Sequence, residues 1–335
     1  MPVQLPISKS IANRLLVLQA LNGMPLTDMS GRDVPEDVKL MHDALVAIGN
    51  GATRLDLQNC GTAMRFLTAY CAQREGQTVV LDGCERMRQR PIGQLVEALR
   101  ACGAEIQYLG EEGFPPLKIN GKRIEAGKCI IVLSQPVSTQ FVSALMLMGL
   151  DVRTDCSSPY IYITREVLRR WAAGEHDFTE RDWSAAAFWY EYAALHEGEL
   201  FLEGLYQTDI QGDKIVADIF RNFGVETCFE ENGVRIGRKK ATGITRYQQS
   251  FKNCPDLYPA VAITCERLSI VLDASGIESL QLKESDRLLA VREHRTYGDH
   301  RIAMALLAAD LPCDDIACIR KSYPTFYEQL CQLRR

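Results

Sequence analysis

The chain has 335 residues, of which 47% are hydrophobic and 24% charged, so global disorder is excluded and two domains are expected. Its net charge of −5 argues against nucleic-acid binding, which usually requires a basic excess. An acidic chain still binds anions when a few of its cationic groups converge in one cleft.

The cysteines and the N-terminus bear on the cellular compartment. The 12 cysteines are scattered without a CxxC pair, and a chain of this length does not depend on disulfides, so we expect free thiols in a reducing cytosol. Only five histidines are present, none beside a cysteine pair, which predicts no zinc site. The first ten residues lack the features of a secretory signal, and the apolar run over residues 143–150 is too short to span a membrane. We therefore expect a cytoplasmic protein.

Helix-like and strand-like segments alternate along the chain. Leucines at helical spacing follow Ser10, and a second helix is predicted over residues 33–49, with a proline and acids at its start and a glycine at its end. Further helices are predicted over residues 62–72 and 91–103. Short buried strands are predicted over residues 78–83, 129–134, 199–204 and 269–274. The alternation predicts an α/β protein.

One pattern of helix, glycine and strand recurs. It occurs at residues 45–53, 99–106 and 220–227, where Gly49, Gly103 and Gly224 are predicted to end their helices in a left-handed conformation. A repeated αβ unit favours a domain built from copies of one block. The alternative, that glycine caps are common in any α/β protein, stays open at this point. A polar stretch over residues 169–183 is the best candidate for a crossing between domains.

Cationic and hydrogen-bonding residues gather at predicted helix starts in the first half of the chain. Lys9 and Arg14 flank one start, where unpaired N–H groups and the helix dipole favour a phosphate or carboxylate. Arg90 lies beside Pro91, the predicted first residue of another helix, and a cation there is unfavourable without an anion nearby. Short polar side chains at residues 138–140 either cap a helix or bind a ligand.

The second half of the chain adds carboxylates to this pattern. Asp256 follows a proline at a helix entry and is either a cap or a base. Residues 283–287 (KESDR) contain four ionisable groups, more than a capping box explains. His300 and Arg301 open a further helix, where a single histidine is more often structural. At least six cations at helix entries of an acidic chain predict a cleft for strongly anionic small molecules.

These segments, in this order, resemble the EPSP synthase family from Ser8 to Gln332. The motifs NCGTAMR, ERMRQRPIG, KESDR and YGDHRIAM carry the resemblance, and IQGDKIVADIF and DWSAAA add to it. The resemblance implies an α/β (α+β) class and the two-domain enolpyruvyl transferase fold, with three repeated βαβαββ units in each domain and the active site in the cleft between them. Residues 8–181 would form one domain, and residues 1–7 with 182–335 the other, which would carry Asp256, Glu284, Arg301 and Lys321.

The resemblance also implies roles for individual residues. Shikimate 3-phosphate would be held by Lys9, Ser10, Arg14, Thr62, Ser138, Thr139, Gln140, Ser157, Tyr160 and Lys283. Phosphoenolpyruvate would be surrounded by Lys9, Asn59, Gly61, Arg90, Arg287, Arg301 and Lys321. The acid–base candidates would be Asp256, Glu284, Lys9 and His300, with Asp256 also in contact with substrate.

The implied reaction suits these residue types. Both substrates carry a phosphate and a carboxylate, which Arg and Lys bind well. The enolpyruvyl group would pass to the 5-hydroxyl of shikimate 3-phosphate through a tetrahedral intermediate, with loss of phosphate, in the chorismate branch of aromatic amino acid biosynthesis. The resemblance implies a monomer that needs no metal or organic cofactor and no nucleic-acid or membrane partner.

The sequence departs from the family in two ways. It is shorter than usual, with the shortfall near residues 150–156, 171–180, 293–295 and 311–315. This indicates either a shortened member or a sequence from which loops are omitted, and the intact motifs favour omission. Ser279 stands where the family often has an asparagine. One alternative is the related UDP-N-acetylglucosamine enolpyruvyl transferase, which typically has asparagine after its N-terminal lysine, where this chain has Ser10. Another is an inactive anion-binding relative, against which the intact Lys9, Asp256, Glu284 and Lys321 argue.

Overall fold

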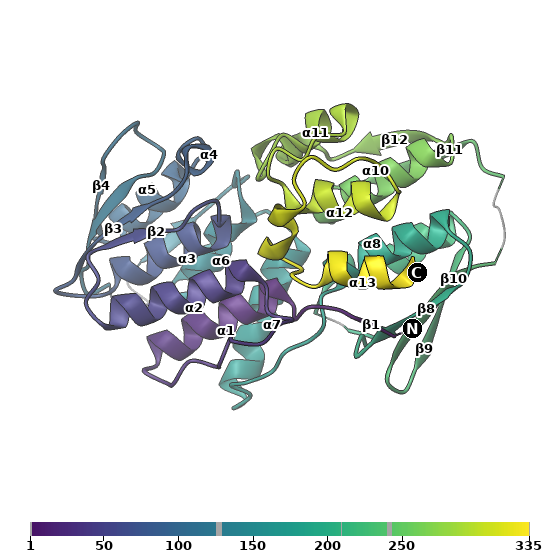
Figure 1. Ribbon diagram of the computed structural model, residues 1–335. Helices are drawn as coiled ribbons and strands as arrows, with labels where there is room; N and C mark the ends of the chain where they lie inside the picture. Colours follow the sequence, from purple (N-terminus) through teal and green to yellow (C-terminus); the bar gives the residue numbers. More distant parts are fainter. Residues whose placement is uncertain (1, 125–128, 209, 240–242, 335) are drawn as a thin grey trace. The chain divides into compact units, whose positions relative to one another are not determined.

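The computed structural model describes residues 2–124, 129–208, 210–239 and 243–334 (Figure 1). The chain divides into two compact units. Unit 1 consists of Met1–Lys9, Ser30–Glu36 and Thr179–Arg335, and unit 2 of Ser10–Met29 and Asp37–Phe178. The short segment Ser30–Glu36 packs with unit 1 although both of its neighbours in the sequence belong to unit 2, which the sequence did not indicate.

Unit 2 contains one complete βαβαββ repeat. Its four-stranded sheet has the order β2-β3-β5-β4, in which β2 is parallel to β3 and the other two pairings are antiparallel. The strands are β2 (Arg54–Asp56), β3 (Thr78–Asp82), β4 (Glu105–Tyr108) and β5 (Leu117–Asn120). A second sheet consists of two parallel strands, β6 (Ile130–Val132) and β7 (Asp151–Arg153).

Seven helices accompany these strands among the described residues: α1 (Lys9–Leu21), α2 (Glu36–Gly49), α3 (Gly61–Ala72), α4 (Glu85–Arg88), α5 (Gly93–Ala101), α6 (Thr139–Leu147) and α7 (Pro159–Ala172). Every residue of α3 except Thr62 is buried. A helix that is apolar on nearly every face must be surrounded by other elements, so α3 forms the centre of this unit.

Unit 1 repeats the same topology. Its four-stranded sheet has the order β1-β8-β10-β9, with β1 parallel to β8 and the other pairings antiparallel. The strands are β1 (Pro2–Gln4), β8 (Glu199–Glu203), β9 (Val225–Glu230) and β10 (Gly233–Arg238). A two-stranded parallel sheet is formed by β11 (Arg246–Ser250) and β12 (Val271–Ser275).

The helices of unit 1 are α8 (Trp183–Leu195), α9 (Val216–Arg221), α10 (Tyr258–Arg267), α11 (Arg287–Glu293), α12 (His300–Ala308) and α13 (Phe326–Leu333). Four 3-10 helices join them: η1 (Gly212–Ile215), η2 (Pro255–Leu257), η3 (Glu278–Leu282) and η4 (Ala317–Lys321). Helix α8 is the core element, since Trp183, Phe188, Trp189 and Tyr190 on it are fully buried. The Trp189 ring packs 5.0 Å from that of Phe326, which anchors α13.

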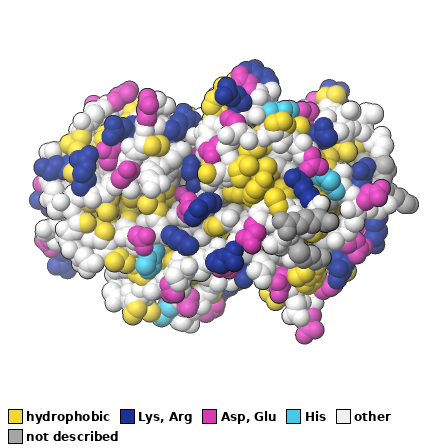
Figure 2. Space-filling view, viewed as in Figure 1, with side chains coloured by type: hydrophobic (Ala, Val, Ile, Leu, Met, Phe, Trp, Pro, Cys, Tyr) yellow, Lys and Arg dark blue, Asp and Glu magenta, His cyan; other side chains and the backbone are white. Residues whose placement is uncertain are grey.

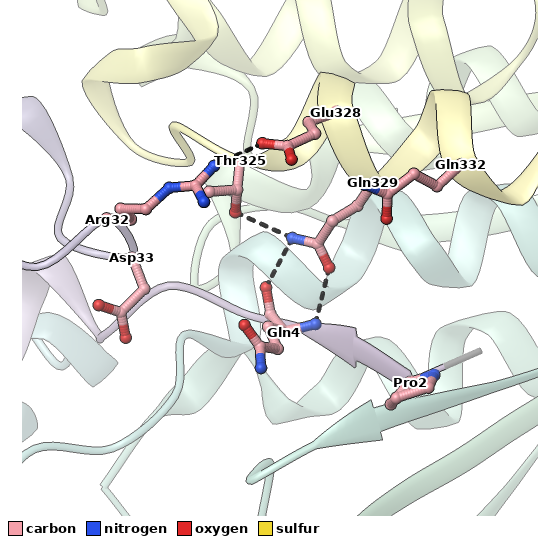
Figure 3. Close-up of a pocket in the computed structure, with 8 residues that line it drawn as sticks. All are labelled: Pro2, Gln4, Arg32, Asp33, Thr325, Glu328, Gln329 and Gln332. Carbon is pink, nitrogen blue, oxygen red and sulfur yellow. Dashed lines mark hydrogen bonds and ion pairs between the residues drawn. The ribbon is translucent and has the colours of Figure 1, made fainter.

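The edge strand β1 is covered by one side chain of α13 (Figure 3). The Gln329 Oε1 atom accepts a hydrogen bond from the Gln4 backbone N–H at 2.7 Å, and Gln329 Nε2 donates to the Gln4 carbonyl at 3.0 Å. The amide thereby occupies the backbone groups that an added strand would use. A cavity of about 560 Å³ lies beside this contact, lined by Pro2, Gln4, Arg32, Asp33, Thr325, Glu328, Gln329 and Gln332.

Each unit also contains a shortened copy of the repeat. In the described residues, β6, α6, β7 and α7 of unit 2 and β11, α10, β12 and α11 of unit 1 follow the βαβα order, but no strand hairpin completes either copy. The chain leaves no room for one: α11 ends at Glu293 and α12 begins at His300. The predicted α/β class and the predicted repetition of one block are confirmed.

Most predicted elements are confirmed, and two helix boundaries are wrong. Gly103 (φ +95°) and Gly224 (φ +85°) are left-handed as predicted, but Gly49 stays within α2 and Gly51 (φ +85°) makes the turn instead. Pro91 is not the first residue of a helix. The Ile92 N–H donates to the Gly113 carbonyl, and α5 begins only at Gly93.

The prediction of free thiols is wrong for one pair. Cys102 and Cys129 form a disulfide, because the end of α5 and the start of β6 bring their Cα atoms within 5.7 Å. Sequence spacing could not reveal this contact, since it depends on the packing of two distant segments. In the described part of the chain, no helix is long and apolar enough for a membrane span, and no cluster of potential metal ligands occurs.

Candidate active site

In unit 2, the residues singled out from the sequence lie at helix N-termini that contact one another. The Ser138 hydroxyl caps α6 by accepting a hydrogen bond from the Gln140 N–H, as the capping alternative predicted. The Gln140 side chain donates from Nε2 to Thr62 Oγ1 at 3.0 Å and so joins the start of α6 to the start of α3. Thr139 is the first residue of α6.

Arg90 lies against the glycine that begins α3. A methyl group added at Gly61 would stand 2.6 Å from Arg90 Nη2, so only glycine lets the guanidinium lie there. Arg90 Nη1 also donates to the Asn59 carbonyl at 3.4 Å, and the side chain is buried. The sequence therefore identified three residues, Asn59, Gly61 and Arg90, that meet at one point of unit 2.

Arg14 connects three helices. Its Nε donates to Thr164 Oγ1 at 2.8 Å, and its Nη2 donates to Ser143 Oγ at 3.2 Å and to the Tyr160 carbonyl at 3.0 Å. With Nη1 bound to the Ser10 carbonyl at 2.6 Å, the buried guanidinium is satisfied by protein acceptors. Burial lowers the pKa of Arg14. This placement suits a positioning residue that fixes α1, α6 and α7.

The remaining candidates of unit 2 lie at the start of α7. Ser158 caps α7 through the Tyr160 N–H, Tyr160 is half-buried, and Ser157 is exposed. No acidic residue occurs in the first turn of α1, α3, α6 or α7. The first turns of these helices thus carry no acid of their own, although the Lys9 N–H at the start of α1 donates to Asp182 Oδ2 at 3.2 Å. Helix starts without acids favour anions.

Unit 1 gathers the acid–base candidates around one arginine. Arg287 is 1% exposed and donates to three carboxylates: Nε to Asp299 Oδ2 at 2.8 Å, Nη1 to Asp256 Oδ1 at 2.7 Å and Nη2 to Glu284 Oε2 at 3.1 Å. These carboxylates come from the starts of α12, α10 and α11. The guanidinium is thus fully engaged and holds the starts of three helices together.

Asp256 is bound by further cations. Arg301 Nη2 lies 2.9 Å from Asp256 Oδ2, and Lys283 Nζ lies 3.5 Å from Oδ1. Burial alone would raise the pKa of this carboxyl, but the positive charges of Arg301, Lys283 and Arg287 outweigh burial and hold that pKa well below its usual value. Asp256 is therefore ionised at neutral pH.

The other cations and the histidine lie in the same region of unit 1. Burial lowers the pKa of Lys283, although the charge of Asp256 opposes that effect. The His300 ring is buried, and burial followed by the charges of Lys9 and Arg301 holds its pKa well below the usual value, so it is neutral. Lys321 Nζ donates to the Gly298 carbonyl at 2.8 Å, two residues before His300.

One residue of this region was missed as a candidate. Asp213 lies on η1 within the IQGDKIVADIF motif, is buried, and accepts a hydrogen bond from Ser184 Oγ at 2.5 Å. Burial, together with the negative charge of Asp256, raises the pKa of Asp213 to about 7. The motif was noticed in the sequence, but nothing in it distinguished this aspartate from an ordinary helix cap.

Solved structures share the arrangement of the whole chain. An EPSP synthase from Acinetobacter baumannii, solved at 2.37 Å, superposes with a TM-score of 0.68, covering 99% of this chain and 95% of the solved one at 20% sequence identity. A second structure of that enzyme gives a TM-score of 0.67. At this identity the likeness shows the fold alone, which is a two-domain α/β fold.

The sequence comparisons identify the family. The profile of EPSP synthase (3-phosphoshikimate 1-carboxyvinyltransferase) matches residues 49–174 and 148–294. The 3-phosphoshikimate 1-carboxyvinyltransferase of Bacteroides fragilis is 34% identical over 395 residues, covering 98% of this chain and 94% of the relative. That of Colwellia psychrerythraea is 28% identical, covering 98% and 96%. The chain belongs to the EPSP synthase family, and the expectation drawn from its motifs is confirmed.

The alignment also accounts for the shortened repeats. It extends over 395 residues, whereas this chain has 335, so the Bacteroides relative contains segments that have no counterpart here.

Proposed function

We propose that this chain transfers the enolpyruvyl group of phosphoenolpyruvate to the 5-hydroxyl of shikimate 3-phosphate and releases phosphate, as a step of chorismate biosynthesis. Family membership supports this reaction. The structural observation that carries it is an ionised Asp256 held by Arg287, Arg301 and Lys283 at the starts of three helices. An ionised carboxylate is in the protonation state that can accept a proton, and the surrounding cations suit anionic substrates.

The acceptor is assigned to the acid-free helix termini of unit 2. Ser138, Thr139 and Gln140 offer hydroxyl, amide and backbone N–H donors at the start of α6, which suits a phosphate group. Tyr160, Ser157 and Ser10 lie at neighbouring helix starts or just before them. Arg14 positions Ser10 and Tyr160 by donating hydrogen bonds to their carbonyl groups.

The donor is assigned to cations of both units. In unit 2, Arg90 beside Asn59 and Gly61 suits its carboxylate or phosphate, since guanidinium groups bind such anions in bidentate fashion. In unit 1, Arg301 and Lys321 serve the same substrate, and Arg287 positions the carboxylates. The shikimate ring is assigned to Lys283.

Three proton transfers accompany the reaction. Asp256 accepts the proton of the 5-hydroxyl as that oxygen attacks the central carbon of phosphoenolpyruvate, and Glu284 or Lys9 donates a proton to the methylene carbon. Phosphate then leaves the tetrahedral intermediate while the methyl carbon returns a proton to the group that protonated it, Glu284 or Lys9. His300, neutral and buried, supports Lys9 and Glu284 without holding a charge.

The proposal extends to the domains, oligomeric state and location of the protein. We assign the two compact units to the two domains of the family, with both contributing to one reaction. A monomer, a cytoplasmic location and the absence of a metal or organic cofactor complete the proposal. Charges of both signs are interspersed over the face shown in Figure 2, without the continuous basic surface that nucleic-acid binding would require.

A phosphate-release assay with phosphoenolpyruvate tests the reaction. We expect turnover with shikimate 3-phosphate and none with UDP-N-acetylglucosamine as the acceptor. Turnover with the second acceptor alone would favour the related enolpyruvyl transferase, and turnover with neither would favour an inactive anion-binding relative.

Two substitutions test the acid–base roles. Asp256→Ala and Glu284→Gln should each lower kcat by roughly 10²–10⁴-fold, because general acid–base groups contribute on that scale. Calorimetric titration should show that both variants still bind shikimate 3-phosphate, since unit 2 supplies most of its assigned ligands. Near-normal turnover in both variants would refute the assignment.

A further inference from the structure

The disulfide lies beside the segment that leads to the proposed phosphate-binding residues. Cys102 follows the last residue of α5, and Cys129 directly precedes β6. Both residues are half-exposed and so accessible to a reductant. The other ten cysteines are free, which leaves this pair as the site of a specific thiol–disulfide exchange.

Residues 129–137 are tied to α5 at both ends. The disulfide fixes the first residue at the end of α5, and the Val137 N–H donates to Gln94 Oε1 at 2.9 Å near the start of that helix. The nine residues of α5 span about 13 Å at ~1.5 Å per residue. Residues 129–137 reach roughly 25 Å when extended. They are therefore long enough to move away from α5 once either tie is released.

Between the two ties the segment is held by strand pairing on one side, by the Leu133 N–H donating to the Arg153 carbonyl at 2.9 Å, and by the Gln135 N–H donating to Asp155 Oδ1 at 2.9 Å. Strand β6 has three residues and pairs only with β7 in the described chain. Its Ile130 and Val132 side chains are 55% and 68% exposed, and burial is limited to Ile131 and Leu133. A short strand paired on one side, with little apolar burial, opens locally at a low free-energy cost.

Opening of this segment would disturb the proposed acceptor site. Val137 directly precedes Ser138, whose hydroxyl caps α6, and Gln140 joins α6 to Thr62. At the other side of the tie, Arg90 lies just before α5. The Val137–Gln94 hydrogen bond joins the start of α5 to the residue before Ser138, whereas the disulfide lies at the opposite end of α5 and reaches Ser138 only through residues 129–137.

We propose that Cys102 and Cys129 are a redox-active pair that sets the affinity for shikimate 3-phosphate, a role that rests on the function proposed above. A dithiol reductant supplies two electrons and two protons, the S–S bond breaks, two thiols form, and the reductant becomes a disulfide. The reduced segment loses one tie and opens more often, which lowers the population of the binding-competent state. Disulfides in reducing compartments are usually transient and sensing, in keeping with this role.

The test compares the oxidised and reduced full-length protein. In the oxidised protein, peptide mass spectrometry should find Cys102 linked to Cys129, and dithiothreitol should release both thiols. Hydrogen exchange of residues 129–137 should accelerate on reduction, and calorimetry should show a roughly three- to tenfold weaker Kd for shikimate 3-phosphate, the effect of a smaller competent population. Cys102→Ser/Cys129→Ser should match the reduced protein under both conditions, and Cys228→Ser, at an exposed cysteine on β9, should respond like the wild type.

Equal exchange rates and equal Kd values in the two redox states would overturn the proposal, as would a failure of the oxidised protein to show the linked peptide. The exchange measurement needs no substrate. If the oxidised protein bound no shikimate 3-phosphate, the proposed function would fail, while the response of residues 129–137 would still decide whether the pair controls the segment.

Discussion

Single residues of this protein show how burial changes chemistry. Asp213 is buried and Asp256 is mostly buried in unit 1. Three cations hold the pKa of Asp256 well below its usual value, whereas burial and the charge of Asp256 raise the pKa of Asp213 to about 7. The two carboxyls thus differ in protonation at neutral pH. Separation of this kind is typical of paired groups that exchange protons with a substrate.

Gly61 allows a prediction about the proposed donor site. An added methyl group would displace the Arg90 guanidinium, which it would otherwise approach to 2.6 Å. We expect Gly61→Ala to raise the KM for phosphoenolpyruvate by roughly 10-fold, because a displaced arginine loses part of a charge-assisted contact. Steady-state kinetics of phosphate release measures the effect.

Gly49→Ala is the matched control, since a methyl group there would meet nothing within 4 Å and the residue is helical. An unchanged KM in Gly61→Ala would show that Arg90 does not bind the donor.

The burial of Glu191 predicts that the stability of the protein depends on pH. This residue of α8 is fully buried, and neither carboxyl oxygen has a hydrogen-bond partner in the described chain. Burial raises its pKa well above the usual value, so the folded state keeps a proton that the unfolded state releases above about pH 4.3. The contribution of Glu191 to stability is therefore complete at lower pH and is lost as pH rises toward the folded-state pKa.

Glu191→Gln should remove this loss, because an amide does not ionise. Urea unfolding should give similar stability for wild type and variant near pH 4.5 and a growing advantage of the variant above it, with a slope of up to ~1.4 kcal/mol per pH unit. Glu197→Gln, an exposed site just beyond α8, serves as the control. Parallel pH profiles for Glu191→Gln and wild type would contradict the prediction.

At the scale of elements, helix starts determine where the proposed chemistry occurs. The starts of α3 and α6 meet through Thr62 and Gln140, and those of α10, α11 and α12 meet through Arg287. The first turns of α3 and α6 contain no acidic residue. The positive ends of their helix dipoles therefore favour an anion. In unit 1 the linked starts carry Asp256, Glu284 and Asp299, which supply the acid–base groups.

The contact between α13 and β1 gives a prediction about stability. Gln329→Ala removes the partner of the Gln4 N–H and one of two donors to the Gln4 carbonyl, which keeps the Tyr323 hydroxyl at 2.7 Å. The variant should lower the free energy of unfolding by about 1–2 kcal/mol, the cost of an unmade backbone hydrogen bond. Urea denaturation with circular dichroism measures it. Gln332→Ala, at an exposed residue of the same helix, should cost less than about 0.5 kcal/mol. Equal losses in both variants would show that Gln329 does not hold the edge strand.

At the scale of the whole molecule, the fold combines complete and shortened copies of one repeat. The two four-stranded sheets share strand order and pairing directions, and each two-stranded parallel sheet is the start of the same repeat. A short parallel sheet needs covering helices, and α6 and α10 connect the strands of each pair. In the described residues, the helix starts that carry the candidate residues are present although neither shortened copy ends in a hairpin.

The sequence by itself determined the class, the family and most of the candidate residues. Apolar periodicity marked α1, α2 and α3, and motifs such as KESDR identified the family, because both are local properties of the chain. Only the tertiary structure decided that Arg14 is satisfied by Thr164 and Tyr160, that Cys102 meets Cys129, and that Asp213 lies close enough to Asp256 to keep its proton. Each of these facts depends on segments far apart in the sequence, whose distance and shared burial arise only when the chain has folded.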